Sequence, residues 1–347
     1  AWPLALVYGL PELVYMLPAA GFGQVIAGFN TTRYDEANRH LRLGRITALD
    51  MLSQLVGVLS AIVLAYWLQS VWALILSGLI GALAELLIYE LCLPGLRNRF
   101  RWERAAAREL IGFGKWIFLS TVAGFVITQA GKLILGKYLP LDMFGIYNIG
   151  YFLASFPLLL GTVLVNRMLI PIYRERPPAA NPAHFSALRK MRFLVSLGLL
   201  ALTAVVGVAG VPIVAWLYDP RYAAAGVITV MVALMQVPAL ITLTYDQAAL
   251  ARGDSKRFFI LAACKAVLMV LCLLVGLELG GLFGAIVGQG VAVVLAYPVV
   301  VWLSRHTGAW DGLHDAVLAL LGLGLVVLCY QANQSAIAAL MARSGAL

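Results

Sequence analysis

The sequence predicts an all-α polytopic membrane protein with about ten visible transmembrane helices in two pseudo-symmetric lobes, the first of them incomplete. Three observations predict this fold class. Ten apolar stretches match the roughly 30 Å hydrocarbon core of a bilayer, where a helix satisfies its own backbone hydrogen bonds. Basic residues gather in every second connection between these stretches. The 347 residues are 62% hydrophobic and 12% charged, with a mean hydropathy of +0.92, outside the range of soluble domains.

Each apolar stretch is interpreted as one transmembrane helix. In chain order the predicted helices cover residues 3-27, 47-67, 72-93, 113-136, 143-165, 193-216, 224-249, 258-278, 283-303 and 315-331. Residues 1-108 are predicted to form a partial N-terminal lobe of about three helices, and residues 109-303 a C-terminal lobe of about six. Residues 304-347 then form an extra helix and a tail.

The basic residues indicate the orientation of these helices, because Lys and Arg stay on the cytoplasmic side. Basic groups follow the first, third, fifth, seventh and ninth stretches; they lie within 33-45, 97-108, 167-192 and 252-257 and at Arg305. The other connections are short and poor in positive charge. The first stretch is therefore expected to enter from the outer face, and an odd number of helices is expected before Ala1. The net charge of +9 follows from topology, and no nucleic-acid partner is expected, because such a partner requires a basic solvated face.

Two stretches of the chain resemble each other at an offset of roughly 210 residues. In the first, Leu43-Gly44-Arg45 precedes a helix, a short turn and the run from Trp72 to Gly78. In the second, Arg252-Gly253-Asp254 precedes a helix, a short turn and the run from Phe283 to Gln289. Repeats of the same orientation predict two bundles related by an axis along the membrane normal, a transporter arrangement.

Several runs in order resemble polysaccharide flippases of the multidrug/oligosaccharidyl-lipid/polysaccharide exporter superfamily. They are Glu109 to Gly114, Lys132 to Leu139, Phe144 to Tyr147 and Arg167 to Tyr173. In the last run the resemblance is to a helix end followed by a Pro-bearing cytoplasmic loop. One departure is that Gly131 precedes Lys132, where the family often has an acidic residue.

The resemblance implies that the protein moves undecaprenyl-pyrophosphate-linked oligosaccharide across the bacterial inner membrane by alternating access, often driven by a proton or sodium gradient. The expected partners are this lipid-linked substrate, membrane lipids, and the polysaccharide polymerase and export machinery. Neither a cofactor nor a metal is expected. The four cysteines lack metal-site spacing, and no Gly-rich nucleotide-binding loop is present.

Lys132 is the leading candidate for substrate binding, because an ionisable group inside a span is costly and a cation there attracts pyrophosphate. Gln129 and Gly136 lie at helical spacing from it and predict a narrow face without bulk. The alternative is that Lys132 snorkels to the outer interface. Asn148 is a second candidate for the substrate, with helix joining as its alternative role. Lys115 is a further substrate candidate.

Ion or proton coupling has three candidates. Asp246 and Lys265 lie at similar depth in consecutive antiparallel helices and are expected to pair, either as a static neutral pair or as a relay. Glu12 is expected near the middle of the first span, on one face with Tyr8 and Tyr15. Glu85 and Glu90 are expected to pair with Arg97 and Arg99, which makes them structural rather than functional, and residues 183-192 predict a basic amphipathic stretch along the headgroups.

Two other functions remain open. An ion-coupled drug exporter of the same superfamily would favour a cavity rich in carboxylates rather than exposed lysines. A membrane-embedded glycosyltransferase or polymerase needs a catalytic carboxylate or histidine on an interfacial loop. The outer connections are too short for such a site. None of the histidines is expected beside a paired carboxylate; they are His40, His184, His306 and His314.

Overall fold

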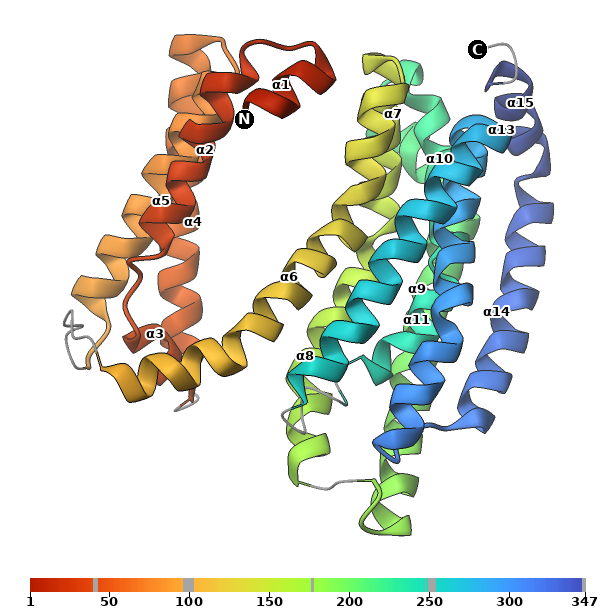
Figure 1. The fold of residues 1–347 in the computed structure, drawn as a ribbon. Helices are drawn as coiled ribbons and strands as arrows, with labels where there is room; N and C mark the ends of the chain where they lie inside the picture. Colours follow the sequence, from red (N-terminus) through yellow and green to blue (C-terminus); the bar gives the residue numbers. More distant parts are fainter. Residues whose placement is uncertain (40–42, 96–102, 176–177, 247, 249–253, 345–347) are drawn as a thin grey trace. The chain divides into compact units, whose positions relative to one another are not determined.

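The computed structural model describes residues 1–39, 43–95, 103–175, 178–246, 248 and 254–344 (Figure 1). Every regular element among them is helical. The chain divides into two compact units, Ala1–Glu103 and Arg104–Leu347. Each unit has its own packed helices, and each is described by itself below.

The first unit is built around an antiparallel pair of helices, α4 and α5. Its elements are α1 (Trp2–Tyr8), α2 (Leu13–Ala27), α3 (Arg33–Arg39), α4 (Leu43–Leu68) and α5 (Trp72–Cys92). Two glycines allow α4 and α5 to approach closely, because a Cβ placed on Gly57 or Gly81 would lie under 4 Å from the Cα of the other. α2 packs against α5.

The first predicted span, residues 3-27, is broken rather than continuous. α1 ends at Gly9, which takes a left-handed conformation with φ of +66°, and Pro11 follows with no backbone N–H to donate. α2 begins only after Glu12, so its 15 residues give about 22 Å of helix, shorter than the hydrocarbon core. The placement of Glu12 inside a continuous helix with Tyr8 and Tyr15 is therefore wrong.

The second unit is a helical bundle in which α10 is the most enclosed element. It contains α6 (Arg104–Tyr138), α7 (Leu141–Ala154), α8 (Phe156–Glu175), α9 (Pro182–Leu217), η1 (Pro220–Tyr222), α10 (Ala223–Met235), α11 (Val237–Thr242), η2 (Leu243–Tyr245), α13 (Ser255–His306), α14 (Gly312–Ala332) and α15 (Gln334–Ser344). Residues 225–234 of α10 are all buried, and α7, α9, α13 and α14 pack around it.

α13 is a helical hairpin rather than one long helix. Its backbone leaves the helical conformation at Gly280 and at Gly281, where φ is +55°. The two arms then pack antiparallel, since a Cβ on Gly276 would lie 2.1 Å from the carbonyl oxygen of Gly284 and one on Gly288 would lie 2.2 Å from that of Cys272. These contacts require glycine, because no side chain fits between the arms.

The described residues contain seven helices that are long and apolar enough to cross a membrane, or eight if the bent pair α7 and α8 forms one span. That count takes the α13 hairpin as a single helix. The protein is thus an all-α polytopic membrane protein, as predicted. With the two arms of α13 taken separately, a helix or bent helix pair overlaps each predicted segment from the second to the tenth.

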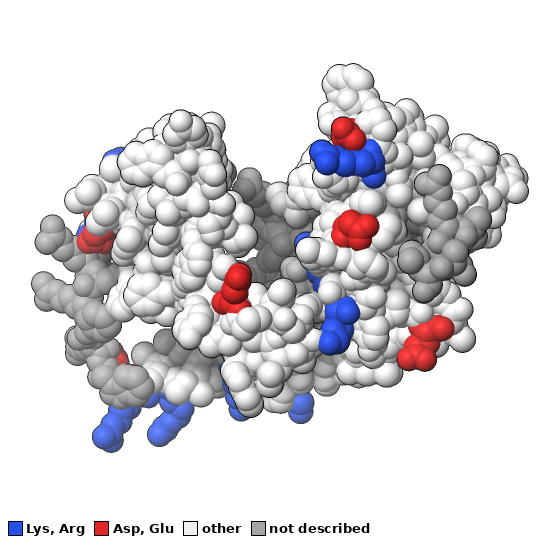
Figure 2. Space-filling model, turned by 90° about the horizontal axis from the view of Figure 1, so that it is seen from above, with Lys and Arg blue, Asp and Glu red and all other residues white. Residues whose placement is uncertain are grey.

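The surface of the chain suits a lipid environment. Large apolar side chains such as Phe152, Leu194 and Trp216 are exposed on the outside of the second unit. In the view of Figure 2, charged side chains appear only as scattered groups among other residues. Because contact with lipid carries no penalty for apolar side chains, their exposure is expected here.

Candidate functional site

An ion pair lies inside the second unit, where the sequence predicts one. Asp246 follows η2, and Lys265 lies on the first arm of α13. The Lys265 Nζ atom donates to Asp246 Oδ1 at 2.6 Å, and both side chains are mostly buried. The expected pairing is therefore confirmed. The pair lines a cavity of about 250 Å³ that is also lined by Thr128, Thr162 and Asn166.

A second cavity adjoins the first and has polar side chains of its own in its lining. It has a volume of about 120 Å³ and shares Thr128 of α6 with the ion-pair cavity. Its polar lining includes two amides: Gln289 donates to the Tyr147 hydroxyl at 3.4 Å, and Gln236 donates to the Ser155 hydroxyl at 3.5 Å. Gln236 ends α10, so a break in that span supplies part of the lining.

Lys132 lines a third and larger cavity, of about 430 Å³. Its Nζ lies 5.5 Å from the centroid of the Tyr151 ring, and Tyr151 also lines the second cavity. Lys132 stands one helical turn from Thr128, which borders the other two cavities. The structure therefore brings Lys132 and the Asp246–Lys265 pair to one series of neighbouring cavities within the second unit.

The other predicted substrate residues do not converge on these cavities. Asn148 donates its side-chain amide to the Phe144 carbonyl of its own helix at 2.9 Å, so it does not join two helices through this bond. The expected open face beside Gly136 is wrong, because the Phe144 ring fills it. Gln129 is half-buried and lines none of the three cavities, and Lys115 is exposed at the other end of α6.

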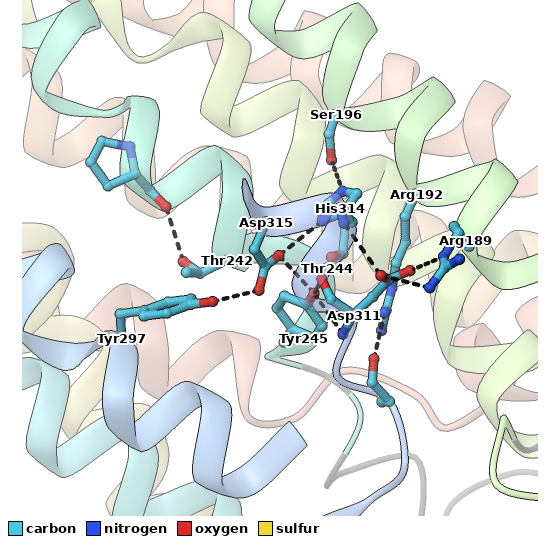
Figure 3. Close-up of polar contacts among 12 residues, drawn as sticks. Arg189, Arg192, Ser196, Thr242, Thr244, Tyr245, Tyr297, Asp311, His314 and Asp315 are labelled. Atoms are coloured by element: carbon cyan, nitrogen blue, oxygen red, sulfur yellow. Dashed lines mark hydrogen bonds and ion pairs between the residues drawn. The ribbon is translucent and has the colours of Figure 1, made fainter. Parts of the chain in front are cut away.

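A buried polar network that the sequence does not predict joins α9, η2, the second arm of α13 and the start of α14 (Figure 3). A tyrosine of α8, Tyr173, also belongs to it. Arg192 is 1% exposed. Its guanidinium donates to the Tyr173 hydroxyl and the Ala309 carbonyl, and it lies 4.4 Å from the centroid of the Tyr245 ring. Residues 183-192 are therefore not a stretch lying along headgroups. They begin the long helix α9, and Arg192 points into the protein.

The same network contains a serine, a histidine and an aspartate in hydrogen-bond order. His314 Nδ1 lies 2.9 Å from Asp315 Oδ1, and Ser196 Oγ lies 3.2 Å from His314 Nε2. The tyrosine hydroxyls of Tyr245 and Tyr297 each donate to Asp315 at 2.7 Å. The expectation that no histidine stands beside a paired carboxylate is therefore wrong for His314, because its partner is the next residue along the chain.

This arrangement holds helices together rather than presenting a nucleophile. Ser196 is 2% exposed and His314 is 0% exposed, and neither lines any of the three cavities. A nucleophile needs room for a substrate beside it. The contacts instead link α9, η2, the second arm of α13 and α14.

Asp311 caps the start of α14 and accepts hydrogen bonds from Arg189, including one from Nη2 at 3.0 Å. Burial raises the pKa of the Asp311 carboxyl, whereas the hydrogen bonds from Arg189 and from the His314 amide lower it. The hydrogen bonds together have the larger effect, so the pKa lies below its ordinary value. Tyr245 and Asp246 are consecutive, one in this network and one in the ion pair. The short segment η2 therefore connects the network to the ion-pair cavity.

The first unit has a cavity of its own between α2, α4 and α5, of about 700 Å³. Glu85 lines it and accepts a hydrogen bond from Asn30 at 3.1 Å. Glu90 pairs with Arg33 at 3.3 Å. The predicted partners of these carboxylates, Arg97 and Arg99, lie outside the described residues. Glu12 is exposed in the turn before α2.

Residues 1–177 match the sequence model of a family described as "Polysaccharide biosynthesis protein". The chain is 25% identical over 234 residues to the amylovoran biosynthesis protein AmsL of Erwinia amylovora, an alignment that covers 65% of this chain and 58% of the relative. It is also 25% identical over 176 residues to the succinoglycan biosynthesis transport protein ExoT of Rhizobium meliloti strain 1021, covering 50% of this chain and 35% of that protein. The matches thus span between a third and three fifths of these relatives. No solved structure matches the chain.

Proposed function

Because the chain belongs to this polysaccharide biosynthesis protein family, we propose that it translocates undecaprenyl-pyrophosphate-linked oligosaccharide across the bacterial inner membrane. The movement proceeds by alternating access and supplies surface polysaccharide biosynthesis. Both relatives are named as polysaccharide biosynthesis proteins, and the name of one, the succinoglycan biosynthesis transport protein, supports a role in transport. The observation that carries the finer proposal is the cation Lys132 at a cavity of the membrane-embedded second unit.

Opposite charges attract each other more strongly away from water. A pyrophosphate carries concentrated negative charge, and a lysine ammonium at a cavity of low dielectric attracts it far more than the same group in bulk water. Lys132 is five residues from Lys137, about 7.5 Å along the helix axis, so its long side chain also reaches toward the outer interface. The Tyr151 ring beside its Nζ supports the cavity position.

The Asp246–Lys265 pair is assigned the coupling role in this proposal. A neutral pair inside a membrane unit is stable while both members stay charged, and protonation of the carboxylate leaves Lys265 as an unpaired cation beside the cavity. That change of one charge is a means of linking proton binding to the packing of η2 and α13. Glu12 is exposed, unlike this buried pair, and is given no coupling role here.

In this proposal the chain is a transporter and not an enzyme, and it needs no cofactor. It works with membrane lipids and delivers its substrate to the polysaccharide polymerase and export machinery. A drug exporter would favour a cavity rich in carboxylates, whereas the charged residue that lines this cavity is Lys132.

Complementation tests the proposal. The full-length parent protein is expected to restore surface polysaccharide in a flippase-null strain, while its Lys132→Ala variant restores it poorly at an equal protein level. Lys137→Ala, which removes a lysine from the outer end of the same helix, serves as the control and is expected to behave like wild type. No restoration by the parent would contradict the function, and normal export by Lys132→Ala would remove Lys132 from the site.

A further inference from the structure

We infer that Lys115, Trp116 and Lys256 form a binding site for the phosphate group of a lipid, at the ends of α6 and α13 that lie at the cytoplasmic face. The inference rests on the proposed function only for the identity of the lipid, because the phosphate chemistry follows from the residues themselves. These residues line none of the cavities described above. Their position gives them access to lipid headgroups before any lipid enters the bundle.

Two helices bring the three side chains together. α6 packs along the first arm of α13 in parallel, with Ala123 against Ala262 and Ala266 and, further along, Ala130 against Met269. The same register places Trp116 against Phe259, with ring centroids 5.6 Å apart.

Both lysines approach the one indole ring. Lys115 Nζ lies 5.5 Å from the centroid of the Trp116 ring, and Lys256 Nζ lies 5.9 Å from it. These distances are within the range of cation–π attraction. Ammonium groups from two different helices thus both lie beside one indole ring.

The depth of both lysines agrees with a headgroup position. Lys115 and Lys137 are separated by 22 residues of α6, about 33 Å along the axis. Lys256 and Glu278 are separated by the same number of residues on the first arm of α13, again about 33 Å. Each pair brackets the roughly 30 Å hydrocarbon core, so Lys115 and Lys256 lie at one interface. Arg104 and Arg108, on the same side of α6, indicate that it is the cytoplasmic one.

Neither lysine has a carboxylate partner among the residues that the structure describes. The nearest acid along α13, Asp254, is already occupied by Arg257, whose Nη1 donates to it at 2.6 Å. Two ammonium groups beside one ring, without a carboxylate partner, leave concentrated positive charge there, and a bound anion compensates that charge. A lipid phosphate supplies such an anion at this depth, and an interfacial tryptophan suits the same layer.

The experiment measures binding of a radiolabelled isoprenoid diphosphate to the full-length parent protein in phosphatidylcholine nanodiscs. Every protein compared, including the reference called wild type here, carries Lys132→Ala, so that the lysine at the cavity does not contribute to the binding measured. Removal of each lysine charge is expected to weaken binding about five-fold, so Lys115→Gln/Lys256→Gln should bind well over ten-fold more weakly than wild type. Lys115→Arg/Lys256→Arg keeps both charges and should bind within two-fold of wild type. Lys190→Gln removes an exposed lysine from α9 and is the charge control.

Wild-type affinity in the double Gln variant, or an equal loss in Lys190→Gln, would overturn the site. Competition identifies the source of the phosphate. If phosphatidylglycerol displaces the label at equal concentration, the site takes ordinary anionic phospholipid as well, and if it does not, the site selects the diphosphate. Because this is a binding measurement, a parent protein that binds the diphosphate through these lysines but fails to translocate lipid-linked oligosaccharide would contradict the proposed function and leave the site standing.

Discussion

At the scale of single residues, the buried charges of the second unit differ in how they are compensated. Asp246 and Lys265 satisfy each other directly. Arg192 instead donates to a hydroxyl and a carbonyl and lies over an aromatic ring. Asp315 accepts hydrogen bonds from two tyrosine hydroxyls and lies within hydrogen-bond distance of a histidine. Removing one charge is therefore expected to have different consequences in each case.

Asp246→Asn and Lys265→Met are each expected to destabilise the protein by about 3–5 kcal/mol, because each leaves one buried charge without its partner. The double variant should be less destabilised than the sum of the two, since neither charge remains. Thermal unfolding of the four proteins in one detergent gives the coupling as a double-mutant cycle. Additive effects would show that the two side chains do not interact.

Asp311→Asn is expected to lower stability at neutral pH by about 1–3 kcal/mol, because it weakens the acceptor for Arg189. The pKa of Asp311 is lowered in the folded protein, so its contribution is complete above the unfolded pKa of about 3.9 and is lost as the pH falls through the folded value. The difference between variant and wild type should therefore shrink in acid.

Unfolding measured between pH 7 and pH 3 checks this dependence. Asp219→Asn is the control, since Asp219 forms a largely exposed pair with Arg221 at 3.5 Å, and such pairs contribute little. A pH-independent loss in Asp311→Asn would contradict the assignment.

The residues of the ion pair could be predicted because two opposite charges at equal depth in neighbouring antiparallel helices have few other partners. The network around Arg192 could not. Asp311, His314 and Asp315 follow the ninth apolar segment, where polar residues normally belong to a solvated connection. Their contact with Arg192 and Ser196 depends on how α9 and α14 pack, and no local spacing in the sequence indicates that packing.

At the scale of elements, apolar length predicted the helices well and their breaks poorly. Gly9 and Pro11 interrupt the first stretch without making it more polar, so hydropathy does not detect the break. Hydropathy also does not detect the end of α10 at Gln236 or the short helices after it, because the segment stays apolar. By contrast, the turn at Gly280-Gly281 lies between two full-length apolar stretches, and length alone places it correctly.

The α13 hairpin gives a prediction at this scale. Gly276→Ala is expected to destabilise the unit by about 1–3 kcal/mol or more, because the added methyl group meets the backbone of Gly284 at 2.1 Å. Gly280→Ala is the matched control for the added methyl group, since nothing lies within 4 Å of a Cβ there. Thermal stability in detergent compares the two, and equal stabilities would contradict the close packing of the arms.

At the scale of the whole molecule, the orientation in the membrane stays a prediction from the alternation of basic connections. Residues 137-142 and 278-281 are expected on the outer side, and Lys115 and Lys256 on the cytoplasmic side. A cysteine placed at Asp142 in a variant without the native cysteines should react with a membrane-impermeant maleimide applied to spheroplasts, whereas one placed at Lys256 should react only after the membrane is opened. The reverse pattern would invert the topology.

Both copies of the predicted repeat fold as helical hairpins with close glycine contacts, α4 with α5 in one unit and the two arms of α13 in the other. The pseudo-symmetric relation between two lobes, and the division at residues 108 and 303, stay predictions. Family membership and the membrane fold support a role in transport. Translocation of a lipid-linked oligosaccharide is the activity to measure directly.

That measurement is translocation by the purified full-length parent in proteoliposomes that contain a fluorescent lipid-linked oligosaccharide. Wild-type protein is expected to move the lipid between leaflets. Lys132→Ala, matched for protein content, should do so at least about ten-fold more slowly, as expected for loss of a charge contact in a low-dielectric site. Equal rates for the two proteins, or no translocation by wild type, would contradict the proposal.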